Sequence, residues 1–83
     1  MEKLMNICDL PKNTPATVTG IDSTDPDLAT RIREIGFAEG DIVELRHQGL
    51  FGRNPLSVRL NGAHIAMRRH EAAAIQVEVR DND

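Results

Sequence analysis

An Asn-Gly pair between two strand-like segments is the clearest indication of how this chain folds. Residues 55–60 (PLSVRL) and 63–68 (AHIAMR) place apolar side chains at every second position, and Asn61-Gly62 joins them. Alternation with a period of two is typical of a strand with one buried face. Asn-Gly is the strongest short hairpin signal, since both residues tolerate the positive φ of a type I′ turn. The sequence therefore predicts an antiparallel hairpin at residues 55–68.

Three further segments have strand character. They are residues 16–21 (ATVTGI), 42–46 (IVELR) and 74–80 (AIQVEVR), and all three contain β-branched residues. The apolar residues expected on their inner faces are Val18, Val43, Leu45, Ile75, Val77 and Val79. Two glycines predict a loop at residues 47–54 (HQGLFGRN), and residues 69–72 (RHEA) are expected to form a short turn.

Residues 23–37 contain the one convincing helix, which is expected at about residues 25–36. Asp25 suits the N-cap, and Pro26 suits the first helical position. Gly36 can adopt the positive φ that ends a helix, and Phe37 is then expected to fold back onto it. The apolar face of this helix consists of Leu28, Ile32 and Ile35.

Five short strands, one helix and a tight hairpin predict a mainly β fold. A small β protein has to protect the edges of its sheet, and closing the sheet into a curved barrel removes them. We therefore expect a small SH3-like β-barrel of about five strands with one inserted helix. Residues 1–83 are expected to form a single domain, with an ordered core at about residues 6–80, because 83 residues are too few to divide.

Composition and charge disfavour several functions. The chain carries 10 Lys and Arg against 13 Asp and Glu, a net charge of −3, and it has two Phe but no Trp or Tyr. Nucleic-acid binding is not expected, because it needs a basic surface and, for single strands, aromatic stacking. The single Cys8 cannot form an internal disulfide, and neither a signal peptide nor a membrane-spanning run is recognisable. These features predict a cytoplasmic protein without direct membrane insertion.

The sequence contains no recognisable catalytic or nucleotide-binding motif. Ser23 and Ser57 lie outside any nucleophile-elbow pattern, and Cys8 has no neighbouring histidine. Gly49 and Gly52 are not followed by Lys-Ser or Lys-Thr, so they do not form a phosphate-binding loop. The sequence therefore predicts that the protein is not an enzyme and has no catalytic residues.

The histidines and the cysteine are the candidate metal ligands. His47, His64, His70 and Cys8 have a spacing that matches no standard ligand motif. It is simpler to interpret the three histidines as exposed residues than as ligands of one metal ion. We therefore expect no dedicated metal site and no cofactor. Weak binding of Fe(II) or Zn(II), or metal bridging between copies, stays open.

Apolar and basic residues near the predicted hairpin are the candidates for a contact surface. Leu50 and Phe51 stand in a glycine-containing loop, where exposed apolar residues often contact a partner. Phe51 can equally fold back to close the end of the barrel. Arg68 and Arg69 either contribute to a binding face or simply solubilise the end of a strand.

Several short motifs follow one another in a recognisable order. They are RIREIGF at residues 31–37, Gly40, VEL at 43–45, Gly52 with Pro55, IAMRRHEA at 65–72 and IQV at 75–77. This order resembles the FeoA family, ferrous iron transport protein A, over nearly the whole chain from about Leu10 to Val79. Much of this pattern consists of glycines at turns and helix ends, so the resemblance identifies mainly a fold. No catalytic residue is inferred from it.

The resemblance implies an SH3-like domain in a small cytoplasmic protein. Family members are thought to bind or regulate a large Fe(II) permease that carries a cytoplasmic G-protein domain. The domain is also similar to the C-terminal SH3-like domain of metal-dependent repressors of the diphtheria-toxin-repressor type. No DNA-binding helix-turn-helix precedes it here, so the stand-alone protein is expected.

We expect an accessory or regulatory protein of bacterial ferrous iron uptake that acts by protein–protein contact. The alternative is a metal-binding protein, either an iron chaperone or a metal-bridged oligomer. The expected partner is the cytosolic G-protein domain or the membrane portion of the permease, and a homo-oligomer stays open. The residues expected to bind the partner are Leu50, Phe51, Gly52, Arg53, Arg31, Arg33, Arg68 and Arg69.

Overall fold

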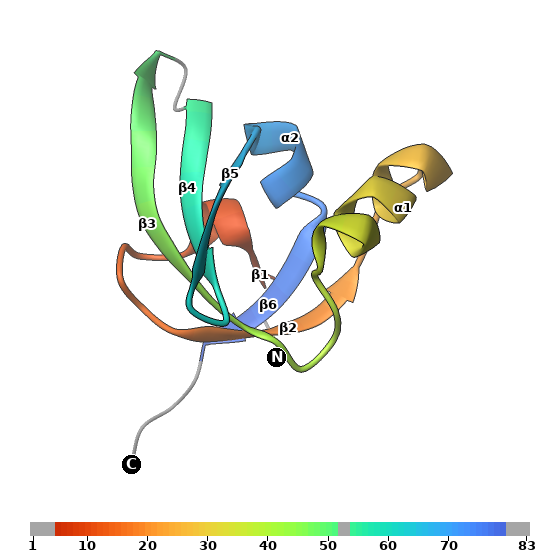
Figure 1. Ribbon diagram of the computed structural model, residues 1–83, viewed down its shortest axis with the longest axis horizontal. Helices are drawn as coiled ribbons and strands as arrows, with labels where there is room; N and C mark the ends of the chain where they lie inside the picture. Colours follow the sequence, from red (N-terminus) through yellow and green to blue (C-terminus); the bar gives the residue numbers. More distant parts are fainter. Residues whose placement is uncertain (1–4, 52–53, 80–83) are drawn as a thin grey trace.

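The computed structural model describes residues 5–51 and 54–79, and all of their side chains except those of residues 50 and 51. Six described strands form one antiparallel sheet in the order β1-β6-β2-β3-β4-β5 (Figure 1). In chain order the elements are β1 (Met5–Asn6), the 3₁₀ turn η1 (Ile7–Asp9), β2 (Ala16–Ile21), α1 (Pro26–Ile35), β3 (Ile42–Phe51), β4 (Asn54–Leu60), β5 (Ala63–Met67), α2 (Arg69–Ala72) and β6 (Ile75–Val79). Neither described α-helix has the length and apolar character needed to cross a membrane.

The mainly β architecture with one long inserted helix is confirmed, with two differences. The sheet is not closed, because β1 and β5 form its two edges. A sixth strand, β1, pairs with β6 through Met5 and Asn6. Two residues are too few to show a period of two, so the sequence pattern could not reveal this strand.

The predicted loop at residues 47–54 is wrong. Strand β3 continues to Phe51 and β4 begins at Asn54, with these two residues paired. His47 pairs with Ser57, and the register shifts on either side of the segment from His47 to Gln48. Such bulges insert extra residues into one strand and mask its alternation, which is why this part of the chain resembled a loop.

Helix α1 begins and ends as the sequence predicts. Asp25 is the N-cap and Pro26 the first helical residue. Gly36 has φ of 125° and donates its N–H to the carbonyl of Arg33 at 3.1 Å, while the N–H of Phe37 reaches the carbonyl of Ile32 at 3.3 Å. This pair of hydrogen bonds is a Schellman motif, which turns the chain back so that Phe37 packs under the helix.

One apolar core lies between the sheet and the helices. Ile32 is fully buried, but Leu28 is only half-buried and Ile35 is 42% exposed, so the predicted apolar face of α1 is buried only in part. The buried apolar residues are Ile7, Leu10, Ala16, Val18, Ile32, Phe37, Val43, Leu45, Leu56, Val58, Leu60, Met67, Ala72, Ala74, Ile75 and Val77. Helix α1 is therefore fixed mainly by its C-terminal turn.

The predicted hairpin at residues 55–68 is confirmed as the pair β4–β5. Asn61 and Gly62 both have positive φ, 49° and 93°, as a type I′ turn requires. Asn61 also binds β3, because its Oδ1 accepts the N–H of Ile42 at 3.2 Å and its own N–H reaches the carbonyl of Ile42 at 3.1 Å. The turn is thus held against the neighbouring strand.

Candidate functional site

A buried carboxylate joins the two helices. Glu71 on α2 is only 7% exposed and is the one buried charged residue in the described part of the chain. Its Oε2 accepts from Nη2 of Arg31 on α1 at 3.0 Å, and its Oε1 accepts the backbone N–H of Arg68 at 2.7 Å. Both carboxylate oxygens are therefore satisfied, as a buried charge requires.

The backbone of Arg69 fixes α2 to two other elements. Its N–H donates to Oδ1 of Asn54, at the start of β4, at 2.7 Å. Its carbonyl accepts from Sγ of Cys8, on η1, at 3.4 Å. The Arg69 side chain takes no part in these hydrogen bonds, and the residue is exposed. Because the backbone of Arg69 is fixed and its side chain is exposed, the positive charge is accessible to a partner.

Three of the predicted partner-binding residues therefore lie on one side of the molecule. Arg31, Arg68 and Arg69 are exposed around α2, and we call them the arginine cluster. Figure 1 shows α2 between α1 and the β3–β4 hairpin. The residues on this side are held by α1, α2 and the β3–β4 hairpin. Binding sites are placed more precisely on helices and strands than on loops.

The other predicted partner-binding residues are not placed with this cluster. Arg33 follows Arg31 by two positions, about 200° around the helix, so it faces away from Arg31. The side chains of Leu50 and Phe51 lie outside the described residues, as do Gly52 and Arg53 altogether. A contact role for residues 50–53 stays a prediction.

Sequence reasoning missed the role of Glu71. Its spacing from Arg68, three residues, is that of a capping box, in which the third helical residue accepts the N-cap N–H. Only half of that signal was present in the sequence, because Arg68 is not one of the residues that usually occupy an N-cap. The bond to Arg31 had no such signal, because the two residues are 40 positions apart.

Glu71→Ala is expected to lower the free energy of unfolding by about 2–3 kcal/mol, because it removes a charged acceptor from two donors. Arg31→Ala is the matched control. It leaves the bond to the Arg68 N–H intact and removes a side chain that is 63% exposed, but Oε2 of the buried Glu71 loses its partner, so we expect a smaller loss of about 1–2 kcal/mol. Urea unfolding of both variants measures the difference. Equal losses would show that the ion pair, rather than the buried cap, stabilises α2.

The candidate metal ligands lie on separate elements. His47 is on β3, His64 on β5, His70 on α2 and Cys8 on η1. Among residues 5–51 and 54–79, no three His, Cys, Asp or Glu side chains gather closely enough to hold a metal ion. Burial raises the pKa of the Cys8 thiol above its ordinary value, the Arg69 charge lowers it and Asp9 raises it by a smaller amount. Burial therefore disfavours the thiolate, which is the form that metals bind.

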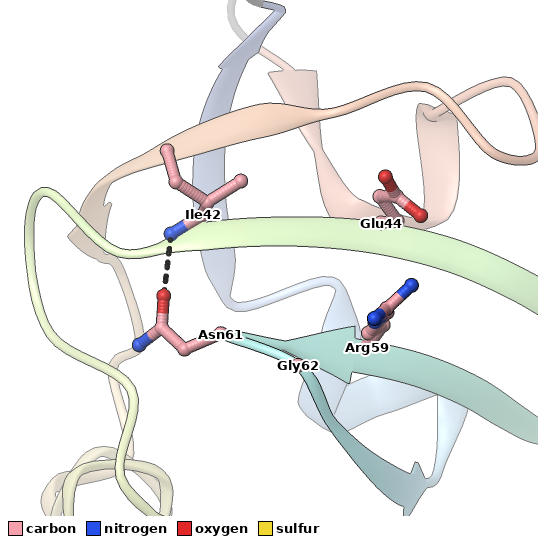
Figure 2. A pocket seen from close by; sticks show the side chains of 5 residues that line it. All are labelled: Ile42, Glu44, Arg59, Asn61 and Gly62. Atoms are coloured by element: carbon pink, nitrogen blue, oxygen red, sulfur yellow. Dashed lines mark hydrogen bonds between the residues drawn. The ribbon is translucent and has the colours of Figure 1, made fainter.

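A shallow pocket of about 200 Å³ opens beside the type I′ turn (Figure 2). Its lining residues are Ile42, Glu44, Arg59, Asn61 and Gly62. Glu44 and Arg59 are cross-strand partners, but the Glu44 carboxylate pairs with Arg46 at 2.8 Å. Ligand clefts in enzymes are usually larger than about 300 Å³ and enclosed, so this pocket has the size of a surface recess.

The sequence and the fold of this chain are similar to those of known proteins. A family model described as the FeoA domain matches residues 5–79. A zinc complex of FeoA from Stenotrophomonas maltophilia is 32% identical over 89% of this chain and 89% of that chain, with a TM-score of 0.77. It is described as an SH3 domain protein and a candidate activating factor of bacterial ferrous iron transport.

Other similarities extend this picture. FeoA from Chlorobium tepidum is 26% identical over 95% of this chain and 73% of that chain, with a TM-score of 0.79. A manganese-dependent transcriptional repressor, 20% identical, shares the fold with a TM-score of 0.84, and the match covers 96% of this chain but 38% of the repressor. A comparison with the curated proteins finds no match. The expected SH3-like fold is confirmed, and the chain belongs to the FeoA domain family.

Proposed function

We propose that this chain is an accessory protein of bacterial ferrous iron uptake that acts in the cytoplasm. It contacts the Fe(II) permease, either at its cytosolic G-protein domain or at its membrane portion, and performs no catalysis. Membership of the FeoA domain family over residues 5–79 is the observation that carries this proposal. The description of the Stenotrophomonas maltophilia relative as a candidate activating factor of ferrous iron transport supports it.

The contact surface that we propose is the arginine cluster together with the end of the β3–β4 hairpin. Arg31, Arg68 and Arg69 provide a charged rim, and Leu50 and Phe51 are the proposed apolar anchors. Interfaces of this kind derive most of their affinity from a few anchors, whereas rim charges guide association. Leu50, Phe51, Gly52, Arg53 and Arg33 belong to this proposal on sequence grounds alone.

Metal binding is the second candidate, because the Stenotrophomonas maltophilia relative was solved with zinc. The described part of this chain brings no three ligands together, and burial disfavours the thiolate form of Cys8. A metal held by one or two histidines would be weak within one copy, so protein contact is the function that we favour.

Charge reversal of one exposed arginine tests the proposed surface. Arg69→Glu is expected to weaken binding to the purified cytosolic domain of the permease by about tenfold, mainly through a slower association rate. The backbone bonds of Arg69 to Asn54 and Cys8 do not involve its side chain, so the fold should be retained. Lys12→Glu is the control, because it makes the same charge change in the exposed loop before β2. Equal affinities for both variants would remove the arginine cluster from the contact surface.

A further inference from the structure

Charge is unevenly distributed along this acidic chain. Residues 45–70 contain none of the 13 Asp and Glu, although they contain all three histidines. They also contain five of the ten basic residues: Arg46, Arg53, Arg59, Arg68 and Arg69. Strands β4 and β5 lie entirely within this range, so one end of the sheet carries positive charge while the rest of the chain is acidic.

Strand β5 is the edge of the sheet at this positive end. In Figure 1 it lies at the edge of the sheet beside β4, with which alone it pairs. Leu60 is opposite Ala63, and Arg59 is opposite His64. The residues that flank a two-residue turn form a hydrogen-bonded pair, and hydrogen-bonded and non-hydrogen-bonded pairs then alternate. The N–H and C=O groups of His64 and Ala66 therefore point away from β4. Among the described residues, no turn or side-chain hydrogen bond reaches the backbone of either one.

This edge also lacks the usual protection against strand addition. Natural edge strands are commonly blocked by proline, by charged side chains, by bulges or by a covering element. Strand β5 (AHIAM) contains no proline, lysine or acidic residue, and its pairing with β4 runs without a register shift. Ala63, His64 and Ala66 are all exposed. The backbone of this edge is thus accessible to an extended segment.

We propose that the β5 edge binds an extended, acidic segment of another protein as an additional strand. The N–H and C=O groups of His64 and Ala66 supply the ladder hydrogen bonds, as in other complexes formed by strand addition. Arg59, beside His64, and Arg68, which follows β5, are exposed and attract carboxylates that flank the added strand. Glu44 is the acidic residue across from Arg59, and its charge is already paired with Arg46.

The charge near the β5 edge favours an acidic segment over a second copy of this chain as the bound strand. Pairing β5 with the β5 strand of another copy would bring the Arg59 and Arg68 side chains of both copies to one junction. Like charges placed together oppose association, whereas an acidic strand neutralises them. This inference goes beyond the proposed function, because it holds whether or not the permease supplies the segment.

A short peptide titration tests the proposal. We expect an acetylated seven-residue peptide of alternating glutamate and valine to shift the His64 and Ala66 amide resonances of ¹⁵N-labelled protein. A peptide of alternating lysine and valine is expected to bind about tenfold more weakly. The glutamate peptide with alternate backbone nitrogens methylated should lose binding, because it cannot complete the ladder. Equal binding by these peptides, or shifts confined to α1 and α2, would overturn the proposal.

Variants of the edge provide a second test. Ala66→Pro removes an outward N–H without removing a bond to β4, and it should weaken binding of the glutamate peptide by about tenfold. Arg59→Glu should weaken it by a similar factor, whereas Lys12→Glu, the matched charge reversal, should leave it unchanged. Sedimentation of the protein alone is expected to show no dimer formed through β5. A dimer that is lost in the Ala66→Pro variant would instead identify a second copy as the occupant.

Discussion

Phe37→Ala is expected to lower the free energy of unfolding by about 3–5 kcal/mol, the largest effect of any single change that we predict. Phe37 is 1% exposed and is the largest fully buried side chain among the residues that the structure describes. It also follows Gly36 in the Schellman motif that returns the chain from α1. Its removal would leave a cavity where the helix meets the core. A domain of this size has about 5 kcal/mol of stability in total, so most of the variant should be unfolded in about 2 M urea.

Ile35→Ala is the matched control for Phe37→Ala. Ile35 is an apolar residue at the end of the same helix, but it is 42% exposed. We expect its removal to cost less than about 1 kcal/mol, since little of its surface leaves water on folding. Urea unfolding of both variants gives the comparison. Similar losses would show that Phe37 does not hold α1 against the core in the way described.

Gly49→Ala is expected to disrupt the β3–β4 hairpin and to lower the free energy of unfolding by about 3 kcal/mol. A Cβ at Gly49 would meet backbone atoms of the opposite strand, Asn54 and the nitrogen of Pro55, well inside van der Waals contact. Backbone atoms cannot rotate away as a side chain can. Asn54 would have to move, and its Oδ1 would lose the N–H of Arg69. We therefore expect reduced binding to the partner as well as reduced stability.

Gly20→Ala is the control that distinguishes the steric clash at Gly49 from the effect of replacing any strand glycine by alanine. Gly20 also lies in a strand, but a Cβ there meets nothing within 4 Å, and its φ is not in the positive range. We expect this variant to be about as stable as the parent or slightly more stable, because alanine restricts the unfolded chain. Thermal unfolding of both variants measures the effect. A Gly49→Ala variant as stable as Gly20→Ala would contradict the packing of β3 on β4.

The parts of the fold that could be predicted from sequence depend on local interactions. The Asn61-Gly62 turn and the Gly36-Phe37 helix end are set by a few neighbouring residues, and both were predicted correctly. The extension of β3 through His47 depends on pairing with β4, interrupted by bulges, and its residues alone suggested a loop. Similarly, helical periodicity identified Ile35 as part of an apolar face but could not show how far that face overlaps the core.

The candidate site was predictable only as a set of residues. Arg31, Arg68 and Arg69 were identified from sequence, but their common location depends on the bond between Arg31 and Glu71, 40 residues apart. The opposite orientation of Arg33 follows from helical geometry, which the sequence already allowed. The exposed β5 edge required the strand order, since alternation within a strand does not tell whether that strand lies at an edge.

The most direct test of the proposed function is an NMR titration with the cytosolic G-protein domain of the ferrous iron permease. The ¹⁵N-labelled chain is titrated first without Fe(II) and then with it. We predict resonance shifts around Arg31, Arg68, Arg69 and Asn54 without metal, because these residues share one side of the molecule. Shifts that need Fe(II) and centre on His47, His64, His70 or Cys8 would contradict contact by the arginine cluster and favour metal binding instead.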